Sequence, residues 1–271
     1  MKKKERKDIS PRHLSYIKKT KKEALKIRLW QVSILVIFLA FWEVASRLKI
    51  IDSFIVSSPS RILKTIRQLY CGGQLWSNIL ATTGETLVGF ALGTVLGVVI
   101  SSLIWYFPTA FKISEPYLVV LNALPKVALG PVIIVWMGAS AGSIILMALL
   151  VSVILSTMSI LQGFISTDKN QILLMKSFGA SRLQVFTKLV FPSNLPLMLS
   201  VLKINIGMSL IGVITGEFLV SESGIGYLIV YGGQVFKMDL VMAGVVILAA
   251  LAWAMYAVVA KTEKLSSKSQ K

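Results

Sequence analysis

Six long stretches of predominantly apolar residues recur along this chain, and shorter polar segments separate them. An α-helix rises about 1.5 Å per residue, so about 20 residues are enough to cross the hydrocarbon core of a bilayer. The pattern therefore predicts an all-α, polytopic membrane protein with six transmembrane helices. The predicted spans are residues 28–47, 78–104, 114–137, 143–164, 194–220 and 238–260.

Proline interrupts the third of these spans. Pro125 and Pro131 each lack a backbone donor and clash with the preceding helical turn, and Lys126 lies between them. We therefore expect this span to be kinked or broken. In hydrocarbon such a break is tolerated only where protein or a water-filled cavity satisfies the freed carbonyl groups.

The longest polar segment enclosed by apolar sequence is residues 168–192, which follows 127–167, a stretch without any charged residue. Apolar residues at helical spacing on either side of Gly179 predict two short amphipathic helices. Gly179 is suited to the turn because glycine adopts a positive φ, and Ser181 is suited to cap the second helix. We expect Phe191 and Pro192 to end that helix.

Glycine recurs at every fourth position in the second span, at Gly89, Gly93 and Gly97. Small residues at this spacing let helix backbones approach closely, so the row predicts a helix-packing face. Between spans, SSPSRILKTIRQLY is typical of a capped amphipathic helix, and residues 221–237 are expected to form a loop on the outer side.

Composition supports the membrane assignment, with 55% apolar and 15% charged residues. The net charge of +17 is not an indication of nucleic-acid binding, since 12 of the 29 Lys and Arg precede or begin the first span. The segments assigned to the cytoplasm are the N-terminal tail, 105–112, 168–192 and the C-terminal tail, and they carry 21 of the 29 Lys and Arg residues. The loops assigned to the opposite side carry six. The positive-inside rule then predicts cytoplasmic tails at 1–27 and 261–271 around a membrane domain at 28–260.

Enzymatic chemistry has little support in the sequence. There is no Gly-rich phosphate loop of the G-x-x-x-x-G-K-[ST] type, so no nucleotide cofactor is expected in this chain. The single histidine, His13, lies in the basic tail, and Cys71 is the single cysteine. Neither a catalytic triad nor a metal site is expected.

Polar and ionisable groups inside spans are costly and therefore mark candidates for a substrate pathway. Lys126 and Lys203 would favour an anion, although Lys203 is equally placed to snorkel to the interface. Asn205 and Ser209 are also consistent with helix–helix hydrogen bonds, and Glu217 with an acceptor for backbone donors. The predicted pathway residues are Pro125, Lys126, Lys203, Asn205, Ser209 and Glu217.

Several motifs together resemble the permease subunits of bacterial ATP-binding-cassette importers. GASRLQVFTKLVFPSNLP resembles the cytoplasmic loop of that family, with Gly179 at a fixed distance before Pro192. Residues 173–175 depart from the family, which usually has an acidic-small-small triplet where this chain has Leu173, Leu174 and Met175. Four further stretches resemble the nitrate, sulfonate, taurine and bicarbonate branch of this family, which also includes thiamine-precursor transporters. These stretches are SSPSRILKTI, TGETLVGFALGTVLGVVI, LPKVALGPVIIVWMG and GVITGEFLVSESGIGYLI.

The resemblance implies a type I importer permease in the bacterial cell membrane, paired as a homodimer. A separate ATPase would bind ATP and Mg²⁺, and an extracytoplasmic binding protein would deliver a small anion such as a sulfonate, taurine or nitrate. A thiamine-precursor pyrimidine is the alternative substrate, and an ATPase-independent secondary transporter or channel is the alternative class. The implied coupling residues are Asp168, Leu173, Leu174, Met175, Gly179, Ala180, Arg182, Phe186 and Pro192.

Overall fold

The computed structural model describes residues 11–269, and the regular secondary structure in this range is entirely helical. Five segments are long and apolar enough to cross a membrane, and a bent helix pair makes a sixth span if its two halves are counted together. The predicted all-α fold with six spans is confirmed. Residues 1–10 and 270–271 of the two predicted tails lie outside the described range.

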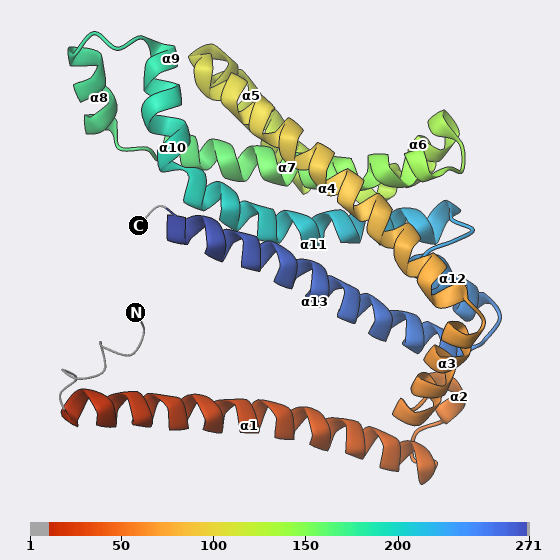
Figure 1. The fold of residues 1–271 in the computed structure, drawn as a ribbon. Coiled ribbons are helices and arrows are strands. Elements are labelled where there is room, and N and C mark those ends of the chain that lie inside the picture. The colour runs from red at the N-terminus through yellow and green to blue at the C-terminus, as the bar shows by residue number, and fades with distance from the viewer. Residues whose placement is uncertain (1–10, 270–271) are drawn as a thin grey trace. The chain divides into compact units, whose positions relative to one another are not determined.

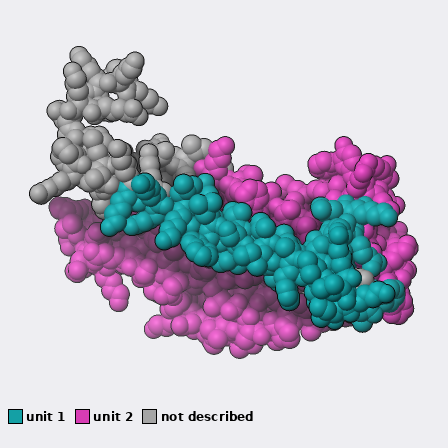
Figure 2. Space-filling model, turned by 90° about the horizontal axis from the view of Figure 1, so that it is seen from below, with its two compact units in different colours: residues 1–64 teal, residues 65–271 magenta. Residues whose placement is uncertain are grey.

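The chain divides into two compact units, one ending at Lys64 and one beginning at Thr65 (Figure 2). The first unit contains α1 (Pro11–Arg47), α2 (Ser53–Val56) and the start of α3 (Pro59–Cys71). The second contains the rest of α3, α4 (Gln74–Tyr106), α5 (Pro108–Ala123), the 3₁₀ turn η1 (Lys126–Leu129), α6 (Gly130–Met137), α7 (Ala141–Ile165), α8 (Lys169–Ser177), α9 (Arg182–Val185), the π-helical turn η2 (Phe186–Val190), α10 (Phe191–Ser193), α11 (Leu195–Val220), α12 (Ile225–Gln234) and α13 (Met238–Ser269).

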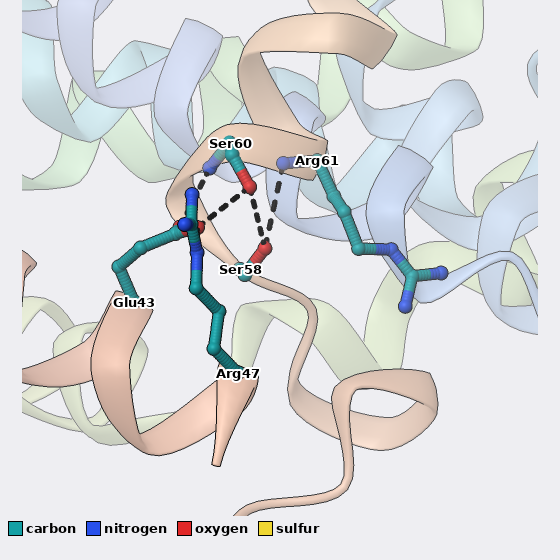
Figure 3. Close-up of polar contacts among 5 residues, drawn as sticks. All are labelled: Glu43, Arg47, Ser58, Ser60 and Arg61. Atoms are coloured by element: carbon teal, nitrogen blue, oxygen red, sulfur yellow. Dashed lines mark hydrogen bonds and ion pairs between the residues drawn. The ribbon is translucent and has the colours of Figure 1, made fainter. Parts of the chain in front are cut away.

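In the first unit, α1 caps the start of α3 through Glu43 (Figure 3). The Glu43 carboxylate accepts hydrogen bonds from the Ser60 backbone N–H at 3.0 Å, the Ser60 hydroxyl at 2.9 Å and Arg47 Nε at 2.8 Å. The Ser58 hydroxyl also accepts from the Arg61 N–H. The N–H groups of a first helical turn have no partner within the helix, so these side chains fix where α3 begins.

The core of the second unit is formed by α4, α7 and α11, with α7 packed against both of the others (Figure 1). The predicted glycine row explains how closely α4 approaches α7. A Cβ atom added to Gly89, Gly93 or Gly97 would overlap Ala148, Ser152 or Ser156, respectively. Small residues on both helices let the backbones approach closely, which favours association where lipid provides no hydrophobic drive between helices.

The predicted break in the third span is present. α5 ends at Ala123, α6 ends at Met137, and the two halves are bent by 87°. Leu124 and Pro125 have extended backbone conformations between them. The span also begins earlier than expected, at Pro108, because proline at the first helical position uses its fixed φ without losing a helical hydrogen bond.

The prediction of a loop over residues 221–237 is wrong, since most of this segment is the helix α12. Its Ile225 and Leu228 are buried against Leu69, Leu240 and Ile247. The segment is therefore held by a hydrophobic cluster of its own with α3 and α13.

Candidate functional site

The polar segment 168–192 forms the two helices that its sequence predicts. Asp168 caps α8 by accepting a hydrogen bond from the Asn170 N–H at 2.8 Å. Gly179 turns the chain with a φ of 79°. The Ser181 hydroxyl then caps α9 by accepting from the Gln184 N–H at 3.3 Å, and Gln184 Oε1 accepts from the Ser181 N–H at 2.7 Å. This reciprocal capping box fixes where the second helix begins.

The second helix does not end at Phe191 and Pro192, contrary to the sequence prediction. Helical backbone continues through Pro192 to Ser193, because the preceding turn widens into a π-helix. The Phe191 N–H donates to the Phe186 carbonyl, five residues earlier. A wider turn accommodates proline, which would otherwise clash with the carbonyl one α-helical turn before it.

One face of the segment packs into the helical core. Val185 and Val190 are buried with Phe164 and Val201, and Met175, Ala180 and Phe186 lie against that cluster. The Phe186 ring lies 5.4 Å from the Phe164 ring in an edge-to-face arrangement. Aromatic pairs of this kind add about 0.5–1.5 kcal/mol beyond the area that they bury. The segment is therefore a packed element with a defined position on α7 and α11.

Arg182 connects the segment to the C-terminal end of α4. Its Nη2 atom donates to the Trp105 carbonyl at 3.0 Å, and its guanidinium carbon lies 5.5 Å from the Trp105 ring and 5.7 Å from the Tyr106 ring. The last carbonyl groups of a helix lack intrahelical donors and carry partial negative charge. The Arg182 guanidinium donates to one of these carbonyl groups, and its positive charge is attracted to the faces of the aromatic rings beside it.

The opposite face of the segment exposes large apolar side chains. Leu173 is 64% exposed, Leu174 57% and Phe178 83%. These three residues form the surface that we call the loop face. No other described residue of the second unit covers it, and it lies outside the candidate membrane spans.

Three of the predicted pathway residues are buried in helix contacts within the second unit. Asn205 and Ser209 have no exposed surface, and Asn205 Nδ2 donates to the Thr94 hydroxyl at 2.7 Å, which links α11 to α4. Glu217 is 1% exposed and accepts from the Thr82 hydroxyl at 2.6 Å. A role for these residues in a pathway stays a prediction.

Lys126 and Pro125 lie at the break between α5 and η1. The Lys126 ammonium donates to the Asn122 carbonyl at 3.0 Å, so it satisfies one of the last carbonyl groups of α5. The Lys126 residue is half-buried. Lys203 lies on α11, one turn before Gly207.

A cavity of 420 Å³ lies beside α12, at the end of the second unit opposite the loop face. Its lining includes Tyr227, Tyr231, Glu222, Gln74 and Ser77. The two tyrosine rings are stacked with their centroids 5.8 Å apart. The lining residues include no lysine or arginine.

Four residues that the sequence did not mark as candidates lie beside the site: Trp105 and Tyr106 contact Arg182, Thr82 donates to Glu217, and Asn78 accepts from the Gly224 N–H. The aromatic pair directly follows the second span, a position at which aromatic residues usually indicate only an interfacial anchor. Asn78 and Thr82 are four residues apart at the start of the same span, so they share a helix face. The four-residue spacing of these two polar residues was the sequence pattern that could have marked them as candidates.

A comparison with protein-family models identifies the family to which these features correspond. Residues 89–264 match the family described as "Binding-protein-dependent transport system inner membrane component". The chain belongs to this family. It is therefore the permease subunit of an ABC importer and a multi-pass inner membrane protein, as its motifs predict.

Curated relatives place the permease in the predicted branch. It is 28% identical over 234 residues to a probable ABC transporter permease protein of Haemophilus influenzae, covering 86% of this chain and 94% of that protein. It is 29% identical to the formylaminopyrimidine transport permease protein ThiX of Halalkalibacterium halodurans, with coverage of 76% and 80%. It is 24% identical to the taurine transport system permease protein TauC of Escherichia coli, with coverage of 82% and 82%.

Among solved structures, the permease fold is similar to a chain of the MetNI methionine ABC transporter in an inward-facing conformation. The TM-score is 0.64 at 14% identity, and the match covers 72% of this chain and 97% of that chain. This likeness confirms the predicted type I importer permease fold.

Proposed function

We propose that this permease imports a small solute with energy from a separate ABC ATPase, and that the loop face is the surface on which this ATPase docks. The ATPase would bind ATP and Mg²⁺. On this proposal the loop and both termini lie in the cytoplasm, as the distribution of 21 Lys and Arg against six favours.

The observation that carries the proposal is the exposed apolar surface of Leu173, Leu174 and Phe178. Exposed apolar side chains on a membrane span are explained by lipid, but these lie on a segment outside the spans. The opposite face of the same segment is packed, so the loop face has a fixed shape for a partner. Leu173 and Leu174 replace residues that are usually acidic or small in the family, which favours an apolar groove on the partner.

Copurification tests the docking. Phe178→Asp is expected to abolish copurification of the ATPase, because a carboxylate at the centre of an apolar interface cannot be desolvated without a partner. Phe178→Leu keeps an apolar side chain and should retain the complex. The membrane-inserted amount of both variants should equal that of the wild type. Full recovery of the ATPase with Phe178→Asp would contradict the proposal, and uptake without ATP would favour a secondary transporter.

We propose further that two copies of the permease form a homodimer around the pathway. The break at Leu124 and Pro125 supports this, since non-helical backbone within hydrocarbon must be covered by protein or water. α5 has no buried residue, so most of its surface is available to a second copy. Lys126 lies at the break and would then face the pathway.

A binding protein would deliver the solute to the end of the permease that carries α12. Lys126 and the taurine permease among the relatives favour a small anion such as taurine or a sulfonate. In the reconstituted complex, ATP-dependent uptake of radiolabelled taurine in the presence of the cognate binding protein tests this candidate.

The cavity beside α12 favours a second candidate, a planar heterocycle such as a thiamine-precursor pyrimidine. Two stacked tyrosine rings offer an aromatic surface, and Glu222 offers an acceptor for ring amino groups. The formylaminopyrimidine permease among the relatives is consistent with it. Competition between formylaminopyrimidine and taurine in the same uptake assay decides between the two candidates.

A further inference from the structure

Three successive backbone N–H groups at the start of α12 each donate to a side chain from another helix. Gly224 donates to Asn78 Oδ1 at 2.7 Å, Ile225 to Thr82 Oγ1 at 2.9 Å, and Gly226 to Glu217 Oε2 at 2.6 Å. The Thr82 hydroxyl in turn donates to Glu217 Oε1 at 2.6 Å. We call Asn78, Thr82 and Glu217 the α12 clamp.

The clamp is buried and its acceptors are used. Glu217 is 1% exposed, Thr82 is fully buried and Asn78 is 8% exposed. A buried carboxylate is costly unless hydrogen bonds satisfy it, and here both of its oxygens accept. The N-terminus of α12 also favours negative charge through its helix dipole. Glu217 is therefore placed to hold α12 and is shielded from any solute.

The glycines of the segment fit this arrangement. A Cβ atom at Gly226 would lie 2.7 Å from Glu217 Oε2 and 2.8 Å from Glu217 Cβ, and one at Gly224 would also overlap the carboxylate. Gly224 has a φ of 108°, which an L side chain rarely adopts. Both glycines are needed for the backbone to approach Glu217.

The two helices that provide the clamp also contact the loop at the opposite end of the unit. α4 begins with Asn78 and Thr82 in its first turns and ends at Trp105 and Tyr106, which contact Arg182. α11 follows α10 almost directly and carries Glu217 near its end. Figure 1 shows α8 and α9 at one end of α4 and α11, and α12 at the other.

We propose that the α12 clamp is the joint through which α4 and α11 carry α12 with them during transport, so that Glu217 is a positioning residue and not a solute ligand. The inference rests on the proposed docking of an ATPase on the loop face. Without the clamp, α12 would be held to the unit mainly by apolar contacts with α3, with α13 and with Leu75 and Ile79 of α4, and apolar contacts allow sliding. Shifts of packed helices of this kind occur in many switching transitions.

Thr82→Val tests the joint with little change in volume, since it removes the hydroxyl that bridges Glu217 and the Ile225 N–H. Thr86→Val is the matched control on the same helix: Thr86 is equally buried, but its hydroxyl donates to the Thr82 carbonyl, within its own helix. Gly226→Ala is a second variant, because its methyl group displaces α12 while the carboxylate remains.

The readout is the distance between spin labels in the complete permease–ATPase complex, on a Cys71→Ser background. One label replaces Leu80 on α4 and the other replaces Gln234 on α12, both of which are exposed. The complex is compared without nucleotide and trapped with ATP and vanadate. In the wild type and Thr86→Val, we expect the same mean distance in both states, because α12 moves with α4.

In Thr82→Val and Gly226→Ala, we expect the distance to differ between the states or its distribution to broaden. ATP-dependent uptake should fall about tenfold, which corresponds to about 1.4 kcal/mol. The amount of ATPase that copurifies should stay unchanged. A variant that failed to fold would instead lose the ATPase. If the clamp variants keep the wild-type distance between the two spin labels and the wild-type uptake, the proposed joint is wrong. Failure of the wild-type permease to bind an ATPase would instead overturn the proposed function.

Discussion

Two segments that connect membrane spans, 168–192 and 221–237, differ in whether their apolar side chains are exposed or packed within the chain. The first leaves Leu173, Leu174 and Phe178 exposed on one face. The second buries Ile225 and Leu228 against α3 and α13 and pairs the N–H groups of Gly224, Ile225 and Gly226 with the α12 clamp. The contrast indicates that the first segment is completed by another protein, whereas the second is completed within the chain.

The largest effect is expected from Gly179→Val, which tests whether the loop face needs its present shape. No atom lies within 4 Å of an added Cβ, so the cost comes from backbone strain at a φ of 79°. Such strain is about 1–3 kcal/mol and is relieved by moving α8 away from α9. We expect ATP-dependent uptake to be abolished while the protein still inserts. Gly179→Asn should retain activity, because asparagine tolerates positive φ; normal uptake by Gly179→Val would refute the requirement.

Gly93→Ala is expected to have the next largest effect, through the core that supports both segments. The added methyl group would overlap Ser152 Oγ, and overpacking of this kind costs about 1–3 kcal/mol. The thermal midpoint of the detergent-solubilised protein should fall, and Ser152→Gly should restore part of it. Gly84→Ala is the control, since nothing lies within 4 Å of its added Cβ. Equal midpoints for the two alanine variants would contradict the close packing of α4 and α7.

Arg182→Ala separates docking of the ATPase from the movement that the loop passes on to α4. It removes the hydrogen bond to the Trp105 carbonyl and the cation–π contacts, which are worth about 0.5–1 kcal/mol at exposed sites. We expect the ATPase to copurify normally while uptake per hydrolysed ATP falls a few-fold. Arg182→Lys should recover only part of the lost uptake, because lysine lacks the planar guanidinium group. A parallel loss of docking and uptake would place Arg182 in the docking surface itself.

Lys126→Gln has the smallest expected effect on structure. Glutamine can still donate to the Asn122 carbonyl, so assembly should not change. If the pathway carries an anion past Lys126, uptake of taurine should decrease because the positive charge is lost. Unchanged taurine uptake would reject a pathway role for Lys126 and leave it as a cap of α5.

Hydrophobic periodicity predicted the spans and the two helices around Gly179, because these depend on local sequence. Ser181 and Gly179 were recognisable for the same reason, as caps and turns have short-range signatures. The π-helical turn before Pro192 was not predicted, since it depends on how a proline is accommodated between packed helices. The α12 clamp joins Thr82 to Glu217 and Ile225, which are more than 130 positions away, so the spacing of Asn78 and Thr82 indicates a shared helix face but not its partners.

The helix α12 shows where the same reasoning failed. Gly224, Gly226, Gly232 and Gly233 favoured a loop on propensity alone. The structure buries Gly224 and Gly226 beside Glu217 and Gly232 beside Val241, so the glycines allow close approach and do not break the helix. Tertiary contacts thus override local propensity at this segment.

Site-specific photo-crosslinking in the membrane tests whether the loop face docks an ATPase. A benzoyl-phenylalanine in place of Phe178 should crosslink to the ATPase subunit. The same probe in place of Val135 on α6 is the matched control, since Phe178 is 83% exposed and Val135 is 82% exposed. We expect an ATPase adduct at position 178 and none at position 135. Equal adducts at both positions, or none at position 178, would contradict docking on the loop face.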